Sequence, residues 1–403
     1  MDHLSITHQV LLAVFLIAAV MGAVAYKTNF CTMGAVSDWV NMNDRGRLGA
    51  WLFAIVLAIV GVLILEGVGV AKFNSTLPPY RTANFAVLRY IVGGFLFGIG
   101  MTLGSGCSFR TMVRAGAGNV KSVMVLVMIG IFSYLMTQTV FYEKLFYGWV
   151  SATTVDLAAR GIPNQDLGQI VGGVLRVGHG GALETWIGAL VALVLLVVIL
   201  RWADFRSRFD NILSGAVVGL GVVAAWYVTA GPMGRAWQDA VAFMDMPPKG
   251  VGAQSFTFVN PTGETLAYLM HPGNTRLVTF GVIALAGVVA GSLVYSVVTR
   301  KFRLEWFHSV TDFVRHMIGG ALMGIGGVLG MGCTIGQGVT GVSTLALGSI
   351  LAFLSIIFGS ALTMKVEYYR LVYEQEASFL AALLSSLVDL RLLPRSLRRL
   401  EAI

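Results

Sequence analysis

Residues 89–107 read RYIVGGFLFGIGMTLGSGC, and residues 315–333 read RHMIGGALMGIGGVLGMGC. The two stretches align without a gap at an offset of 226 residues, from position 89 to position 315. Such self-similarity within one chain indicates an internal repeat. The positions that the two copies share include the cysteines Cys107/Cys333 and the glycines Gly93/Gly319, Gly94/Gly320, Gly98/Gly324, Gly100/Gly326, Gly104/Gly330 and Gly106/Gly332.

The composition around this repeat is that of a membrane protein. The chain has 403 residues, of which 56% are hydrophobic and 12% are charged, whereas a soluble domain carries about 25% charged residues. Its 49 glycines and 17 methionines suit closely packed membrane helices. The net charge of +8 comes from basic residues in short loops between apolar runs. That distribution follows membrane topology and excludes a nucleic-acid-binding face.

Apolar runs long enough to cross a bilayer recur along the whole chain. The first run spans residues 10–22 and is followed by Ala23-Val24-Ala25, which resembles a signal-peptidase site. Residues 1–9 contain no Lys or Arg, so we expect a retained span and not a signal peptide. The nine predicted spans are 9–26, 48–70, 87–104, 120–139, 182–200, 212–230, 277–298, 315–331 and 342–363.

The two copies of the repeat fall in the third and the eighth predicted span. Their places in the order of spans differ by five, an odd number, so they run in opposite directions and predict an inverted-topology repeat, as in many transporters. The fold class predicted is therefore an all-α polytopic membrane protein with broken, re-entrant helices. We expect a first half at 1–150, a second half at 182–365 and an amphipathic cytoplasmic tail at 366–403.

The distribution of basic residues predicts the orientation. With the N-terminus in the periplasm, about two thirds of the 28 Lys and Arg residues fall on the cytoplasmic side. The C-terminus is then cytoplasmic, in the inner membrane of a bacterial cell. Longer polar connections at 140–180 and 231–275 could be partly helical or re-entrant.

The three cysteines carry the candidate site. An odd number without a CxxC pair argues against a disulfide framework or a structural zinc site. Each cysteine follows a predicted span and precedes a hydroxyl residue, and the broken helices predicted there would present free N–H groups that attract anions. A thiol suits a soft sulfur anion, and three weak sites in series let an anion pass without being trapped. The candidate residues are Cys31, Cys107 and Cys333, supported by Thr32, Ser108 and Thr334 and by Gly104, Gly106, Gly330 and Gly332, which we expect to supply the unusual backbone angles.

Topology places Cys31 and Cys107 on the cytoplasmic side of the path and Cys333 on the periplasmic side. Arg110 and Arg114 follow Cys107 and could attract anions or simply determine topology. The six histidines show no metal-ligand spacing, and no nucleotide-binding motif is present, so we expect neither a metal nor another cofactor.

These cysteine motifs resemble the YeeE/YedE family of bacterial sulfur-transport membrane proteins. The likeness rests on NFCTMG around Cys31, GSGCS at 104–108 and GMGCT at 330–334, and covers roughly residues 8–365. It implies an hourglass-shaped bundle of about nine spans whose three cysteines relay thiosulfate by transient S–H···S contacts. It also implies a small cytosolic sulfur-carrier protein as a partner. The insert at 231–275 and the tail after 366 do not match the family motifs.

Two other functions compete with thiosulfate import. A membrane sulfurtransferase would take the sulfane sulfur onto Cys107 as a persulfide, but no histidine lies near a cysteine in sequence to activate it. A transporter of another small anion, such as sulfite or a selenium species, would use the same path. Sulfate fits poorly because its oxygens gain little from thiols. We therefore expect a transporter and not an enzyme.

Overall fold

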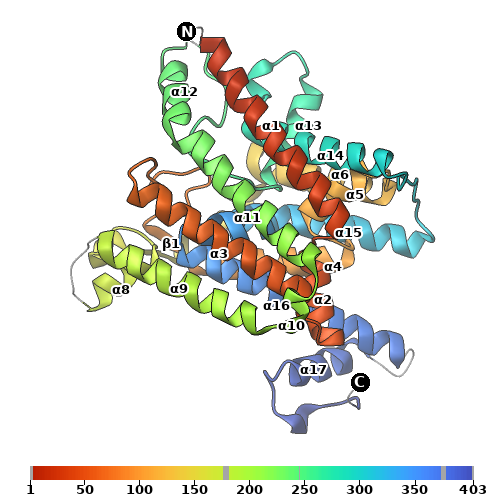
Figure 1. Ribbon diagram of the computed structural model, residues 1–403. Helices are drawn as coiled ribbons and strands as arrows, with labels where there is room; N and C mark the ends of the chain where they lie inside the picture. Colours follow the sequence, from red (N-terminus) through yellow and green to blue (C-terminus); the bar gives the residue numbers. More distant parts are fainter. Residues whose placement is uncertain (1–2, 176–180, 245, 374–377, 402–403) are drawn as a thin grey trace.

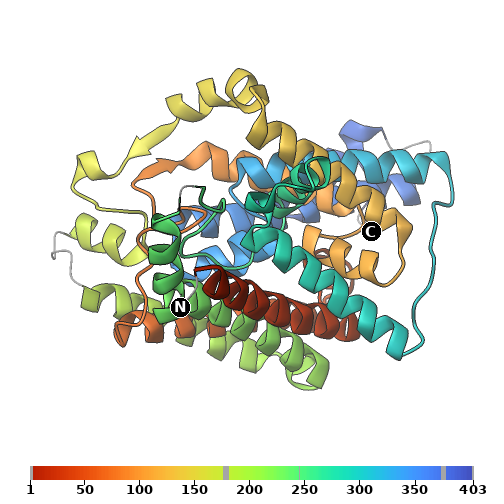
Figure 2. The same ribbon diagram turned by 90° about the horizontal axis from the view of Figure 1, so that it is seen from above.

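The computed structural model describes residues 3–175, 181–244, 246–373 and 378–401. The chain folds as an assembly of helices with one short two-stranded ribbon (Figures 1 and 2). The elements up to residue 175 are α1 His3–Thr28, α2 Thr32–Met42, α3 Gly46–Gly67, β1 Asn84–Ala86, α4 Val87–Leu103, α5 Ser108–Gly116, α6 Val120–Gln138, the π-helix η1 Glu143–Tyr147, α7 Gly148–Ala152, β2 Thr154–Asp156, η2 Ala158–Arg160 and α8 Leu167–Leu175.

The remaining elements are again almost all helical. The strands β1 and β2 pair antiparallel, with Phe85 opposite Val155. The elements after residue 180 are α9 Gly181–Arg201, α10 Ala203–Arg206, α11 Phe209–Ala230, α12 Pro232–Ala242, α13 Asn260–Met270, η3 Thr275–Leu277, α14 Phe280–Val298, α15 Val310–Leu329, the π-helix η4 Gly336–Gly341, α16 Leu347–Val372, α17 Phe379–Asp389 and η5 Arg395–Leu397.

Among the described residues, eight helical stretches are long and apolar enough to cross a membrane, one fewer than predicted. The missing one is the predicted span 315–331. It is present as the helix α15, but Asp312, Arg315 and His316 make its first turns polar. The eight stretches are Ile6–Met42, Gly46–Gly67, Val87–Gly116, Val120–Gln138, Gly181–Arg201, Phe209–Ala230, Phe280–Val298 and Leu347–Val372.

Glycines bring α4 and α15 together at the centre of the molecule. A Cβ atom on Gly93 would lie 2.3 Å from the backbone nitrogen of Gly330, and one on Gly319 would lie 2.4 Å from that of Gly104. The two backbones therefore touch at both ends of an antiparallel crossing, which no larger side chain permits. On their outer sides, Gly94 of α4 contacts α16, and Gly320 of α15 contacts α6.

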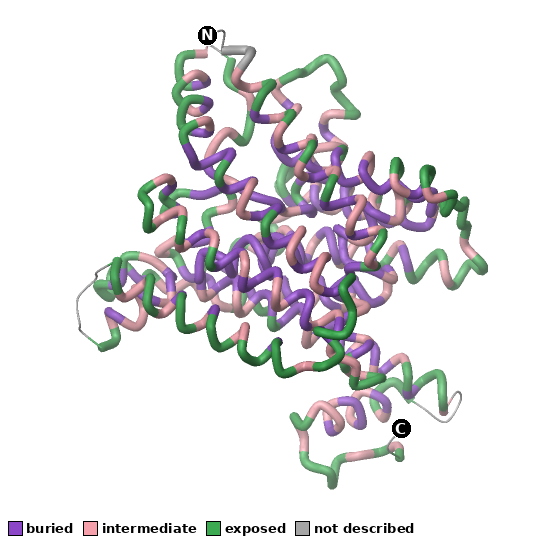
Figure 3. The backbone as a smooth tube through the Cα atoms, viewed as in Figure 1, coloured by how far each residue is buried: buried purple, intermediate pink, exposed green. Residues whose placement is uncertain are grey.

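Long helices surround this centre in pairs. The helix α1 lies along α14, and α3 lies along α11 (Figure 1). Buried residues gather in the middle of the molecule and include the whole of 332–346, whereas α9 is largely exposed along one edge (Figure 3). Its exposed side chains, including Leu190 and Leu193, are apolar, as expected of a surface that faces lipid.

Two non-helical segments enter the core. The connection before β1 buries Phe73, Tyr80 and Arg81, and the segment before α13 buries Phe256 and Phe258. The predicted polar connection 231–275 is thus partly helical and partly an extended, buried segment. Residues from 366 onward begin inside α16, and α17 then packs back on that helix. Within the predicted tail, residues 374–377 and 402–403 lie outside the described residues.

Candidate functional site

The three cysteines occupy turns of one backbone form. In each turn a helix ends, the residue two positions before the cysteine has a positive φ, and the cysteine itself begins the next helical segment. The amide directly before each cysteine bonds back to the carbonyl five residues earlier, which closes the helix. These shared features are φ of 55° at Asn29, 58° at Ser105 and 62° at Met331, with the bonds Phe30 N to Ala25 O at 3.2 Å, Gly106 N to Met101 O at 3.0 Å and Gly332 N to Gly327 O at 2.8 Å.

This geometry corrects one expectation. The unusual backbone angle falls on Ser105 and Met331, and not on the neighbouring glycines as predicted. Gly104 and Gly330 end their helices with negative φ values, and they are small because the partner helix approaches their backbone. The predicted helix breaks are present: α4 gives way to α5 at Cys107, and α1 gives way to α2 at Cys31.

The three thiols are free and buried. The thiols of Cys31 and Cys107 lie close enough to influence each other, although they come from different helices. The Cys107 thiol also faces the side chain of Thr334, the residue directly after Cys333. The sulfur of Cys31 accepts a hydrogen bond from Gly34 N at 3.4 Å, and that of Cys333 accepts one from Gly336 N at 3.4 Å. The fold therefore brings together the three turns that the sequence singled out.

A hydroxyl group without a hydrogen-bond partner follows each cysteine. Thr32, Ser108 and Thr334 are at most 2% exposed, and among the described residues none of their hydroxyls makes a hydrogen bond. Thr334 lies beside the Cys107 thiol, but outside hydrogen-bond geometry. Buried polar groups are nearly always satisfied, because leaving one unpaired costs about 1–3 kcal/mol. Three such groups, one after each cysteine, are therefore candidates for contact with a ligand.

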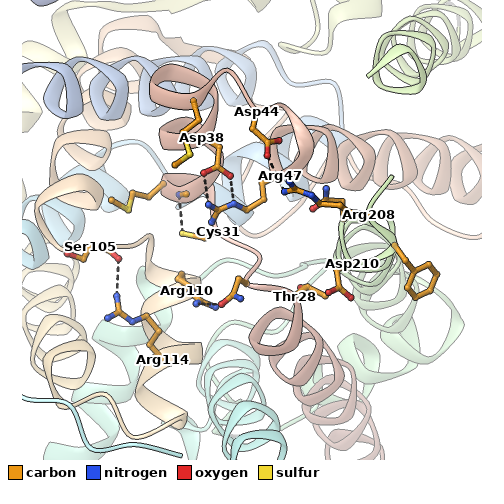
Figure 4. A pocket seen from close by; sticks show the side chains of 16 residues that line it. Thr28, Cys31, Asp38, Asp44, Arg47, Ser105, Arg110, Arg114, Arg208 and Asp210 are labelled. Atoms are coloured by element: carbon orange, nitrogen blue, oxygen red, sulfur yellow. Dashed lines mark hydrogen bonds and ion pairs between the residues drawn. The ribbon is translucent and has the colours of Figure 1, made fainter. Parts of the chain in front are cut away.

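A wide pocket of about 960 Å³, here called the Cys31 pocket, reaches Cys31 and Ser105 (Figure 4). Two of its arginines are paired with carboxylates. Arg47 donates to Asp38 through Nε at 2.5 Å and through Nη2 at 2.6 Å, and Arg208 lies 3.1 Å from Asp44. The other lining residues include Thr28, Asn29, Met33, Gly34, Met42, Arg110, Arg114, Phe209, Asp210 and Asn211.

Arg110 differs from these paired arginines. Its guanidinium donates to Asn29 Oδ1 at 2.8 Å and to Ala25 O at 3.4 Å, but it makes no ion pair among the described residues. It lies within electrostatic range of both Cys31 and Cys107. Arg114 instead donates to Ser105 O at 3.1 Å and lies 3.8 Å from Glu305. Arg110 is therefore the better placed of the two to attract an anion toward the thiols.

A second pocket of about 390 Å³, the Thr257 pocket, reaches the Cys333 turn. Met331, Gly332 and Thr257 line it, together with the charged residues Arg89 and Glu264. It shares no lining residue with the Cys31 pocket. One pocket thus approaches the Cys107 turn, and the other approaches the Cys333 turn.

Sequence reasoning missed two polar residues near Cys333. Gln337 is fully buried, and its Nε2 donates to Gly330 O at 2.6 Å while its Oε1 has no partner among the described residues. Tyr80 is 2% exposed, and its hydroxyl also has no partner among the described residues. It lies within electrostatic range of the Cys333 thiol. Gln337 could have been noticed as a polar residue in a run of glycines, but Tyr80 comes from a connection with no such signal.

A buried charge network lies next to Tyr80. The Arg81 guanidinium lies 2.6 Å from Glu66 and 3.1 Å from Asp166, and its Nε donates to Thr344 O at 2.9 Å. The contact with Asp166 is an ion pair without hydrogen-bond geometry. Burial raises the pKa of the Asp166 carboxyl to about 6, although Arg81 opposes the shift. This network fixes the connection that carries Tyr80 to the chain that follows η4.

No group of three or more His, Cys, Asp or Glu side chains that could hold a metal occurs within the described ranges. The polar groups around the cysteine turns include thiols, hydroxyls and the guanidiniums of Arg110 and Arg89, neither of which makes an ion pair among the described residues.

The chain is similar to known sulfur-transport proteins. A family described as sulphur transport matches residues 27–362. The thiosulfate transporter TsuA of Escherichia coli (strain K12) is 26% identical over 329 residues, which cover 76% of this chain and 80% of that protein. The TsuA of Spirochaeta thermophila is 25% identical over 359 residues, which cover 86% and 95% respectively.

Proposed function

Because the chain belongs to the sulphur transport family, we propose that it imports thiosulfate across the inner membrane along a path through Cys31, Cys107 and Cys333. The observation that carries this proposal is the pairing, at all three turns, of a buried thiol with a buried hydroxyl that has no partner among the described residues. The printed function of the two relatives supports the choice of anion.

The chemistry of thiosulfate fits such a pair of groups. Its terminal sulfur is soft and polarizable, whereas its three oxygens are hard hydrogen-bond acceptors. A cysteine offers a weak S–H donor to the first, and the adjacent Thr or Ser hydroxyl offers an O–H donor to the second. An anion with only oxygen atoms would use the hydroxyls but gain little from the thiols.

The spacing of the three sites favours a relay without covalent bonds. The Cys31 and Cys107 thiols lie close to each other, and Thr334, directly after Cys333, lies beside the Cys107 thiol. An anion held by weak donors at one turn can then pass to the next without leaving the buried centre. Several weak sites in series allow passage without trapping.

The same proposal includes an inverted repeat with an hourglass-like path. The reciprocal contacts of Gly93 with Gly330 and of Gly319 with Gly104 support a two-fold relation between α4 and α15. The Cys31 and Thr257 pockets would be the two wide ends, and the cysteines the narrow centre. With the N-terminus in the periplasm, the arginine-lined Cys31 pocket faces the cytoplasm, where a small sulfur-carrier protein could collect the anion.

Uptake of labelled thiosulfate tests the proposal, in cells that lack other sulfur importers. We expect import with the wild type and almost none with Cys107→Ser or Cys333→Ser, at equal amounts of protein in the membrane. Wild-type protein that imports no thiosulfate would overturn the proposal, and sulfite and selenium anions would then be compared as competitors. A gain of one sulfur atom on a cysteine after exposure to thiosulfate, measured by mass spectrometry, would instead support the sulfurtransferase.

A further inference from the structure

The offset that relates the two helix breaks also links Cys31 with a residue outside the cysteine motifs. At 226 positions after Phe30 and Cys31, the chain has Phe256 and Thr257. Cys31 precedes α2 and Thr257 precedes α13, and each of these helices has 11 residues. Thr257 therefore occupies the place in the second half that Cys31 occupies in the first.

The contacts of Thr257 match this relation. A Cβ atom on Gly336 would lie 2.4 Å from Thr257 Oγ1, so the hydroxyl lies directly against the Gly336 backbone. The Gly336 amide in turn donates to the Cys333 thiol at 3.4 Å. In the first half the residue that corresponds to Gly336 is Arg110, which lies within electrostatic range of Cys31. Thr257 thus stands next to the Cys333 turn as Cys31 stands next to the Cys107 turn.

The position of Thr257 is fixed by its neighbours. Phe256 and Phe258 on either side are fully buried, and the carbonyl of Phe256 accepts a hydrogen bond from Thr340 Oγ1 at 2.7 Å. The ring of Phe258 stacks on Phe109, which follows the Cys107 turn, at a centroid distance of 5.2 Å. Thr257 itself is only partly buried and lines the Thr257 pocket beside Gly332.

A positive charge in the same pocket favours an anion there. The Arg89 guanidinium donates to the carbonyls of Leu329 at 2.6 Å and Val328 at 3.3 Å, and it makes no ion pair among the described residues. It lies 5.7 Å from the centroid of the Tyr142 ring, and no carboxylate among the described residues neutralises its charge. The opposing carboxyl, Glu264, already accepts a hydrogen bond from Thr279.

We infer that Thr257 forms a fourth anion contact, which binds the oxygen end of a thiosulfate-like anion between the Thr257 pocket and the Cys333 turn. This inference rests on the proposed transport function. A hydroxyl in place of a thiol means that this contact selects for oxyanion groups, whereas the three cysteine turns select for sulfur. The path then has four anion contacts, with a hydroxyl at the Thr257 end and a thiol at the Cys31 end.

Three variants test the role of the hydroxyl. Thr257→Val removes it at nearly constant volume, and Thr257→Ser retains it. Thr137→Val is the matched control, because Thr137 lines the same pocket but its hydroxyl already donates to Ser133 O at 2.8 Å. At low thiosulfate we expect uptake to fall about tenfold in Thr257→Val, as for the loss of one hydrogen bond to a charged group, and to stay near wild type in the other two.

A binding measurement accompanies uptake, so that a folding defect is not mistaken for a lost contact. Thiosulfate should raise the melting temperature of the purified wild type and of Thr137→Val, while Thr257→Val should need about tenfold more thiosulfate for the same rise. Its melting temperature without thiosulfate should equal that of the wild type. If the wild type imports thiosulfate and Thr257→Val matches it in both measurements, this inference fails alone. A wild type without uptake overturns the transport proposal and this inference together.

Discussion

The Cys31 pocket and the Thr257 pocket lie next to related turns, yet their linings differ. The first has a volume of about 960 Å³ and four arginines, and the second has about 390 Å³ and only Arg89. At the two positions related by the offset, the first pocket has Cys31 and Arg110, whereas the second region has Thr257 and Gly336. The stretches 89–107 and 315–333 thus share glycines and a cysteine where α4 and α15 pack, and they differ at the two pockets.

This difference suggests separate tasks for the two ends. A hydroxyl in the smaller pocket suits selection of an anion, and a thiol beside an unpaired cation in the larger pocket suits holding it. The centre, where Cys107 faces both Cys31 and Thr334, serves both. Substitutions at the centre and at each end should therefore differ in size and in kind.

The largest effect is expected at the centre. Cys107→Ser should reduce uptake of thiosulfate about 100-fold or more, because the proposed path runs past this thiol at its middle, whereas Cys31→Ser at one end should reduce it less. Initial rates at equal membrane abundance measure both. Equal, small losses in the two variants would contradict a single path through Cys107.

The next largest effect is expected from removing the charge of Arg110 in the Cys31 pocket. Arg110→Gln should raise the KM for thiosulfate about tenfold with little change in the maximal rate, since a hydrogen bond to a charged group contributes about 1.5–3 kcal/mol. Arg208→Gln is the control, because Arg208 lines the same pocket but is already paired with Asp44 at 3.1 Å. A similar KM in both variants would mean that the pocket acts through its total charge and not through Arg110.

Much of the region around Cys107 and Cys333 could be predicted from the sequence, because the stretches 89–107 and 315–333 resemble each other. Aligned glycines and cysteines identified the helix breaks at Cys107 and Cys333, and the hydroxyl after each cysteine was visible in the motif. The ends could not be predicted in this way. Tyr80 and Arg81 come from a connection between spans, and Thr257 comes from a segment that reads as a polar insert.

Backbone conformation also escaped prediction. The left-handed residues are Ser105 and Met331, types that rarely adopt a positive φ, and only the closing bonds of the completed turns require it. Among the described residues, eight helical stretches meet the length and hydropathy of a membrane span, against nine predicted, and α15 is the one not counted. Asp312 and Arg315 at the start of α15 lower its hydropathy, yet packing against α4 and α6 holds that helix in place.

The two ends also differ in how their ion pairs are buried, which predicts a difference in stability. Side-chain exposure is 2% for Arg81 but 61% for Arg208. Arg81→Met should lower the free energy of unfolding by about 3 kcal/mol, because it leaves Asp166 and Glu66 charged and unpaired. Arg208→Gln should cost less than about 1 kcal/mol. Thermal melts of the purified proteins compare the two, and equal losses would contradict a structural role for Arg81.

The free energy of unfolding of Arg81→Met should also depend on pH in a predictable way. Because burial raises the pKa of Asp166 to about 6 from 3.8, the folded protein takes up this proton at a higher pH than the unfolded chain does. The contribution of Asp166 to stability therefore rises as the pH falls from about 6 toward 4. Without Arg81 the carboxyl loses its opposing charge, so Arg81→Met should recover more stability between pH 7 and pH 5 than the wild type gains. A parallel change in both proteins would contradict the pairing.

The smallest effect is expected for Thr334→Val, which should raise the melting temperature and lower the uptake of thiosulfate. The Thr334 hydroxyl is buried without a partner among the described residues, which costs the folded protein about 1 kcal/mol. Thr334→Val keeps the shape and removes that cost, so the melting temperature should rise slightly while uptake of thiosulfate falls severalfold. Ser360→Ala is the control, because its buried hydroxyl lies 2.9 Å from that of Thr102 and its removal should lower stability without lowering uptake. If Thr334→Val proved less stable and equally active, the hydroxyl would have a structural partner in the folded protein, and the argument that it awaits an anion would fail.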